Sequence, residues 1–360
     1  MSSDIPDLTA LERTNIATMT AMTAFWFFCL GACLGSFLNV IVYRLPRGVS
    51  LSRKRSCCPS CDQPIELRDN IPILGWLKLC GRCRNCQWPI PARYPLVELL
   101  VASQFAVLLF VELFSGGTNL PVREPEHWKG VVWTVWYLKY PDLMESYLFH
   151  CLLLYLATAF TLIAADGHRA TRSLFAFGVI AGLGWLAIEP RLNPLLGLPG
   201  WWGSLEWSHR GTALWNGLLG LAIGASLGGV LGMMTPRDEA APTRSALVAI
   251  LSLCGLYLGW KAAVSTSGLT LALSLFLRMI AVVLPPLRRV PVTASLLAAM
   301  HFQILFWRQL GSIPFWPSHS QRWHEHGAVI AILIGVAIVL RERRSSPERA
   351  LIESGSSAAE

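Results

Sequence analysis

The sequence predicts an all-α fold: a polytopic membrane helix bundle of about nine transmembrane helices with a small cytoplasmic loop domain. Two features of composition support this. Of the 360 residues, 53% are hydrophobic and only 14% are charged, whereas a soluble domain carries about 25% charged residues. Apolar runs long enough to approach or cross a hydrocarbon core of about 30 Å recur along the whole chain. A third feature, two closely spaced cysteine pairs, falls between the first two of these runs.

The apolar runs define the expected spans and the segments between them. The spans are expected near 19–43, 96–114, 147–165, 172–188, 212–234, 245–264, 268–284, 293–307 and 326–340. Residues 1–18 are polar and form an external N-terminal segment without an evident cleavable signal peptide. The segments 19–114 and 147–340 are expected to be two membrane domains, and residues 341–360 a disordered cytoplasmic tail.

The loop 44–95 carries nearly all of the chain's excess charge. It holds ten basic residues against three acids, a net +7, while the whole chain has a net charge of +8. Cytoplasmic loops are enriched in Lys and Arg, so this loop is expected in the cytoplasm, with the N-terminus external and the C-terminus internal. The charge therefore indicates topology in a lipid bilayer, and no nucleic-acid partner is expected.

Four cysteines in the loop form two pairs, C-P-S-C and C-R-N-C, with 21 residues between them. Their thiolates on two tight turns can close a tetrahedral shell of four sulfurs around zinc. A redox role would need a thioredoxin-like βαβ context, which the sequence lacks. The predicted zinc ligands are Cys58, Cys61, Cys83 and Cys86. Cys57 and Cys80 lie beside the pairs, and either could exchange with a neighbouring ligand.

Small and polar residues mark places where the spans should pack closely. Glycines repeat every four residues from Gly220 to Gly232, and Gly31 and Gly35 do so in the first span, which allows another helix backbone to approach. Ser36 and Asn39 lie near the end of that span, where polar groups are expected to bond inside the bundle.

The region 31–100 resembles the N-terminal domain of bacterial prepilin peptidases. The residues that carry the resemblance are G-S-F-L-N-V-I-V-Y-R-L-P at the first span, the four cysteines, D-N-I-P-I-L-G-W between the pairs and R-Y-P-L-V-E-L-L after them. The resemblance implies a protein of the bacterial inner membrane whose cytoplasmic loop binds zinc. It also implies cleavage of type IV prepilins or type II secretion pseudopilins, followed by N-methylation with S-adenosylmethionine.

The family's peptidase half uses two aspartates, which share a proton so that one activates water while the other protonates the leaving group. The resemblance assigns the first role to Asp166 in L-I-A-A-D-G-H-R, although the family's following L-P-D is missing. The family's second aspartate lies in a GxGD motif that is absent here, where Leu247 takes its place. Asp238 is the nearest substitute, and it could also be an ordinary solvated acid.

Two functions therefore remain open at the level of sequence. The chain is either an intramembrane aspartic endopeptidase with possible methyltransferase activity, or a catalytically degenerate membrane protein. The second kind of protein would bind prepilins, scaffold a secretion assembly or retain methylation alone. A transporter has little support, because charges inside the spans are few and no broken-helix pair stands out.

Overall fold

A computed structural model confirms the all-helical fold class. The residues that it describes are 9–52, 56–121, 123, 135, 141–194, 207–233, 235, 240–313 and 316–317. Within these ranges every regular element is a helix. The chain divides into two compact units, Met1–Leu162 with Pro199–Trp202, and Ile163–Leu198 with Gly203–Glu360. The domain boundaries expected from the apolar runs stay a prediction.

Six of the described helices are long and apolar enough to cross a membrane. They are α1 (Ala10–Arg44), α3 (Arg93–Leu108) with its π-helical continuation η3 (Leu109–Phe114), α4 (Pro141–Ala165), α6 (Trp207–Met233), α7 (Ala240–Leu258) and α8 (Trp260–Ile280). Two apolar helices are shorter, α5 (Arg172–Ile188) and α9 (Val292–Leu305). The expected span 326–340 lies outside the described residues, so the number of nine stays a prediction.

Short elements complete the fold. They are η1 (Leu45–Arg47), η2 (Leu67–Asp69), α2 (Leu74–Lys78), η5 (Pro190–Leu192), η6 (Pro285–Arg289) and α10 (Trp307–Ser312). Helix α1 begins nine residues before the expected apolar run because a capping box starts it. The Thr9 side chain accepts from the Glu12 N–H at 3.3 Å, and the Glu12 carboxylate accepts from the Thr9 N–H at 2.8 Å.

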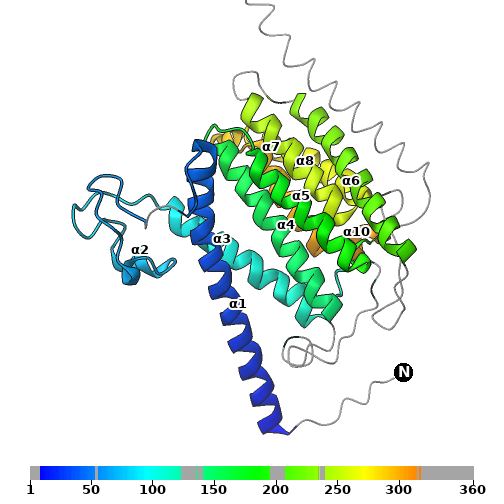
Figure 1. Cartoon of the computed structure of the whole chain (residues 1–360), viewed down its shortest axis with the longest axis horizontal. Coiled ribbons are helices and arrows are strands. Elements are labelled where there is room, and N and C mark those ends of the chain that lie inside the picture. Colours follow the sequence, from blue (N-terminus) through cyan, green and yellow to red (C-terminus); the bar gives the residue numbers. More distant parts are fainter. Residues whose placement is uncertain are drawn as a thin grey trace, which may run out of the picture. The chain divides into compact units, whose positions relative to one another are not determined.

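In the first unit, α1 packs against α3 through the two predicted glycines. A Cβ atom added at Gly31 would lie 2.8 Å from Cα of Ala102, and one added at Gly35 would lie 2.7 Å from Cα of Glu98. Helices α1 and α3 cross in Figure 1. Helix α4 joins the same unit, and the Tyr147 hydroxyl donates to the Phe105 carbonyl oxygen at 3.1 Å.

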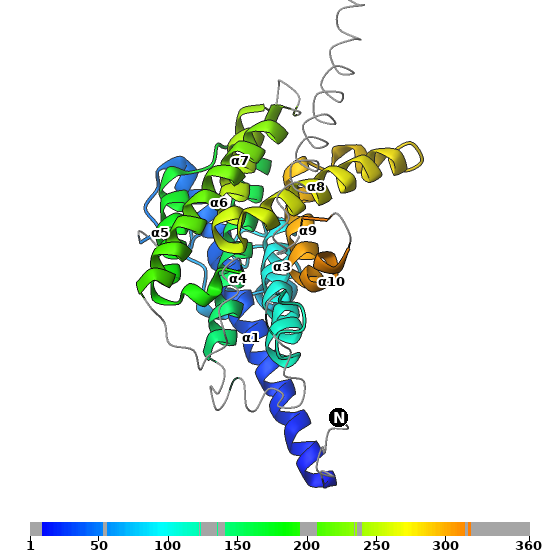
Figure 2. The same ribbon diagram turned by 90° about the vertical axis from the view of Figure 1, so that its right-hand side faces the viewer.

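In the second unit, the glycine-rich face of α6 packs against α7. A Cβ atom at Gly220 would lie 2.0 Å from the carbonyl oxygen of Gly255, and one at Gly224 would lie 2.0 Å from that of Leu251. The two helices run side by side in Figure 1 and Figure 2. The close helix packing that the glycine spacing predicts is therefore confirmed.

The boundary between α7 and α8 lies earlier than the apolar runs suggested. The sequence placed a break at the polar residues 265–267, but the chain turns at Gly259, which has φ of 84°. The Ser267 hydroxyl donates to the Ala263 carbonyl oxygen at 2.8 Å, and Thr270 bonds Thr266 in the same way at 2.7 Å. These local bonds satisfy the hydroxyl groups, so polar residues are tolerated inside a buried helix.

Candidate metal centre

The two cysteine pairs lie in equivalent turns, 25 residues apart (83 minus 58). The backbone N–H of Cys58 donates to the carbonyl oxygen five residues later at 3.0 Å, and the N–H of Cys83 does the same at 2.9 Å. The residue after each pair, Asp62 or Gln87, has a positive φ, of 55° and 58°. An isolated antiparallel bridge closes each turn. The sequence therefore folds locally into two copies of one metal-binding turn.

The turns bring all four predicted ligands together. One sulfur each comes from Cys58, Cys61, Cys83 and Cys86, and these atoms lie within 4.8 Å of one another. The sulfurs of Cys58 and Cys86 are 3.7 Å apart. Zinc–sulfur bonds of about 2.3 Å in a tetrahedron place sulfurs about 3.8 Å apart. The donor set and its spacing therefore fit a closed four-thiolate site, and neither Cys57 nor Cys80 belongs to the cluster.

Hydrogen bonds make the thiols of the cluster chemically unequal. Backbone N–H groups of Cys86 and Asn85 stabilise the thiolate of Cys83 and lower its pKa to about 6. The Gln63 backbone also favours the thiolate of Cys61, but burial and hydrogen bonds with the neighbouring sulfurs outweigh it and raise the pKa of Cys61 to about 12. Four thiolates at this spacing repel one another, and a bound divalent metal would offset half of their negative charge.

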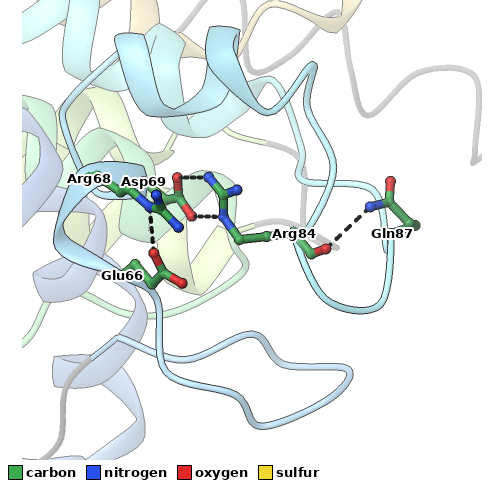
Figure 3. Close-up of polar contacts among 5 residues, drawn as sticks. All are labelled: Glu66, Arg68, Asp69, Arg84 and Gln87. Carbon is green, nitrogen blue, oxygen red and sulfur yellow. Dashed lines mark hydrogen bonds and ion pairs between the residues drawn. The ribbon is translucent and has the colours of Figure 1, made fainter.

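An ion pair ties the second turn to the segment between the cysteine pairs (Figure 3). Arg84 donates to both oxygens of the Asp69 carboxylate, at 2.6 Å and 2.5 Å. The Asp69 side chain is only 4% exposed, and the hydrogen bond from Arg84 lowers its pKa. The neighbouring pair of Arg68 and Glu66 is exposed, so water screens it more strongly. Asp69 and Arg84 therefore fix the second turn in place.

Two glycines and a tryptophan shape the segment around this ion pair. The Trp76 indole N–H donates to the carbonyl oxygen of Ile90 at 2.9 Å. A Cβ atom at Gly75 would lie 2.1 Å from the Asp69 carbonyl oxygen, and one at Gly81 would lie 2.8 Å from the Trp76 ring. Gly81 also has φ of 68°. These contacts explain why small residues are needed at both positions.

Glu98 connects the loop to the helices of the first unit. Its carboxylate accepts from the backbone N–H of Ile73 at 2.6 Å and also bonds the side chain of Ser36 on α1. Ile73 has φ of 63°, which is rare for a β-branched residue. The Asn39 amide donates to the carbonyl oxygen of Tyr94 at 3.2 Å. The polar residues near the end of the first span thus bond inside the unit, as the sequence predicts.

The structure describes one of the two predicted aspartates. Asp166 is partly buried and directly follows α4, in a turn closed by the bond from the His168 N–H to the Ile163 carbonyl oxygen at 3.0 Å. The same turn contacts α7, because the Ala170 N–H donates to the Ser245 hydroxyl at 2.9 Å. Asp238 lies outside the described residues.

A buried carboxylate–imidazole pair was not predicted from the sequence. Glu112 lies in η3, is 0% exposed, and its Oε1 is 2.7 Å from Nδ1 of His150 on α4. The amide of Asn119 donates to the same oxygen at 3.4 Å, whereas Oε2 of Glu112 has no hydrogen-bond partner in the described part of the chain. Both residues interrupt apolar runs, and an ionisable residue inside a span is a signal that could have found the pair.

Fold and site together define a class of protein: a multi-helix membrane-type chain with a four-thiolate centre in a basic loop between its first two spans. Residues 29–112 match the family model described as the Bacterial Peptidase A24 N-terminal domain. This match covers the region that resembles prepilin peptidases and confirms the resemblance. No solved structure matches the chain.

Curated relatives match the same part of the chain. A "Prepilin leader peptidase/N-methyltransferase" of Myxococcus xanthus (strain DK1622) is 50% identical over 86 residues, 24% of this chain and 26% of the relative. A "Type 4 prepilin-like proteins leader peptide-processing enzyme" of Escherichia coli O78:H11 is 45% identical over 104 residues, 24% of this chain and 39% of the relative. A "Prepilin leader peptidase/N-methyltransferase" of Aeromonas hydrophila is 46% identical over 99 residues, which are 21% of this chain and 34% of the relative. The matches therefore span between a quarter and two fifths of these relatives.

Proposed function

We propose that this chain is a prepilin leader peptidase of the inner membrane that also N-methylates its product. The observation that carries the proposal is the four-thiolate cluster inside a domain that is 50% identical to a relative named for both activities. The substrate would be a type IV prepilin or a type II pseudopilin. The positive charge of the loop supports an orientation with the N-terminus external and the C-terminus cytoplasmic.

The peptidase step would use Asp166 and Asp238 as a proton-sharing pair. One carboxylate removes a proton from water, which attacks the scissile carbonyl carbon, and the other protonates the departing amine as the peptide bond breaks. Two facts support this pairing. The turn that contains Asp166 bonds Ser245 near the start of α7, and Asp238 precedes the first residue of α7, Ala240, by two positions.

The methylation step would follow at the new N-terminus. The exposed α-amino group attacks the methyl group of S-adenosylmethionine, a carbon–nitrogen bond forms, and S-adenosylhomocysteine and a proton leave. Zinc would be held by Cys58, Cys61, Cys83 and Cys86, and a site closed by four thiolates stabilises structure rather than activating water. The metal would keep the loop folded beside the substrate.

A degenerate protein that binds or scaffolds prepilins is the second candidate. It is favoured by the missing GxGD and L-P-D motifs. The aligned position of the second aspartate is Leu247, which is fully buried in α7. A protein of this kind could retain methylation alone.

Co-expression of the full chain with a prepilin separates the two candidates. Leader removal shifts the gel mobility of the pilin, and mass spectrometry of its N-terminus reports methylation. We expect cleavage with the parent chain and with Asp7→Asn, and its loss in Asp166→Asn and Asp238→Asn. Cleavage that persists in Asp166→Asn, or in Asp166→Ala made as a second variant, would refute the assignment of that residue. Prepilin binding or methylation without any cleavage by the parent chain would establish the degenerate alternative.

A further inference from the structure

The loop that carries the cysteine pairs exposes large apolar side chains outside the membrane-length helices. The side chain of Leu67 is 90% exposed, that of Leu74 is 61% exposed and that of Trp88 is 56% exposed. All three lie between the end of α1 and the start of α3. A small folded loop rarely leaves several large apolar side chains in water, so their exposure indicates a surface that something covers.

Basic side chains accompany this apolar surface. The three acids of the loop 44–95 leave it with a net charge of +7. The structure pairs two of the acids with arginines, Glu66 with Arg68 and Asp69 with Arg84, while Lys78 is exposed. The surface therefore combines apolar and cationic groups, which suits a covering partner that is apolar and anionic.

The loop is also held close to the membrane helices at both ends. It leaves α1 at Arg44 and enters α3 at Arg93, and Glu98 ties its middle to α3 through Ile73. Tyr94 is exposed at the start of α3, where an aromatic ring suits the membrane interface.

We propose that the loop docks onto the anionic headgroup region of the same bilayer through the face of α2 that carries Leu74, Leu77 and Lys78, and through the exposed side chains of Leu67 and Trp88. The apolar side chains enter the boundary between headgroups and acyl chains, while the lysine and its basic neighbours bind lipid phosphates. Charge complementarity and the attachment of both loop ends to membrane-length helices favour lipid over a protein partner. The inference does not depend on the proposed peptidase activity.

Photo-crosslinking tests this surface in the intact protein. The full chain is reconstituted in nanodiscs of phosphatidylcholine alone or with phosphatidylglycerol, with p-benzoylphenylalanine in place of Leu67. The matched control carries the probe in place of Gln63, which is exposed but polar. We expect several-fold more lipid adducts at position 67 than at position 63, and more adducts when phosphatidylglycerol is present. A Lys78→Gln, Arg82→Gln variant should reduce the effect of the anionic lipid.

Two further readouts make the experiment decisive. Zinc content shows whether each variant keeps a folded loop, and the same probe in place of Trp88 gives a second position if the first variant fails to fold. Equal lipid adducts at positions 67 and 63 would overturn the proposal. So would adducts that move from lipid to peptide when a prepilin is added, because the surface would then be a protein-docking site.

Discussion

Replacing Gly224 by alanine should force α6 and α7 apart, because the added Cβ atom would lie 2.0 Å from the Leu251 carbonyl oxygen and 2.6 Å from its carbon. Real Cβ contacts almost never fall below 3.0 Å, so the backbones must separate by about 1 Å at this point. The obstacle is main chain, which no rotamer change can move. Overpacking of this kind costs about 1–3 kcal/mol.

The matched control is Gly229→Ala on the same helix. A Cβ atom at Gly229 has no neighbour within 4 Å, and the better helix propensity of alanine returns about 1 kcal/mol. Gly224→Ala gains the same propensity, so we expect a net destabilisation of up to about 2 kcal/mol there and a slight stabilisation in the control.

Titration of the detergent-solubilised protein with sodium dodecyl sulfate, followed by tryptophan fluorescence, measures the free energy of unfolding of both variants. Equal effects in the two variants, or a stabilised Gly224→Ala protein, would refute the reasoning. That result would mean that α6 and α7 are not in backbone contact at Gly224.

Three other predictions concern the first unit. Purified protein should contain one zinc ion per chain by mass spectrometry; Cys83→Ser should lose it, whereas Cys57→Ser, outside the cluster, should keep it. Replacing His150 by leucine should destabilise the unit by about 1–3 kcal/mol, because the buried side chain of Glu112 loses the shorter of the two hydrogen bonds to its Oε1. The double variant with leucine at both positions should recover part of that loss in an unfolding titration, and strict additivity would contradict the pairing. The ion pair lowers the pKa of Asp69, so its stabilisation is present above the ordinary value of about 3.9 and disappears as the pH falls through the lower folded-state value. Hydrogen exchange of the loop should therefore be faster in Asp69→Asn than in the parent chain, by the same factor at pH 7 and at pH 6, because both values lie well above the ordinary pKa. A factor that shrinks between pH 7 and pH 6 would contradict this.

Much of the fold could be predicted because its signals are local. Hydropathy located most of the long helices in the described part of the chain, since each span must satisfy its own backbone in lipid. The glycine spacing predicted close packing because a helix face repeats every three to four residues. The paired cysteines predicted the metal cluster for the same reason: both turns are short, and each places two sulfurs side by side.

Features that depend on long-range pairing were missed, and one helix boundary was misplaced. Glu112 and His150 are 38 residues apart in the sequence, and neither residue alone indicates its partner. The break at Gly259 was misplaced because hydroxyl groups such as that of Ser267 bond within their own helix and do not interrupt it. The ion pair of Asp69 with Arg84 likewise depends on how the loop folds back on itself.

A metal ion bound by both cysteine turns would restrict the unfolded chain. A metal ion that joins turns 25 residues apart (83 minus 58) acts as a cross-link and removes conformational freedom from the unfolded loop. The chain-entropy relation for a cross-linked loop of this length gives about 3.5 kcal/mol at 25 °C. Oxidation of a single cysteine in the cluster would remove this contribution to stability, and the segment that carries α2 would no longer be held by the metal. The thiol redox state of the compartment would then decide whether the loop presents an ordered surface at all.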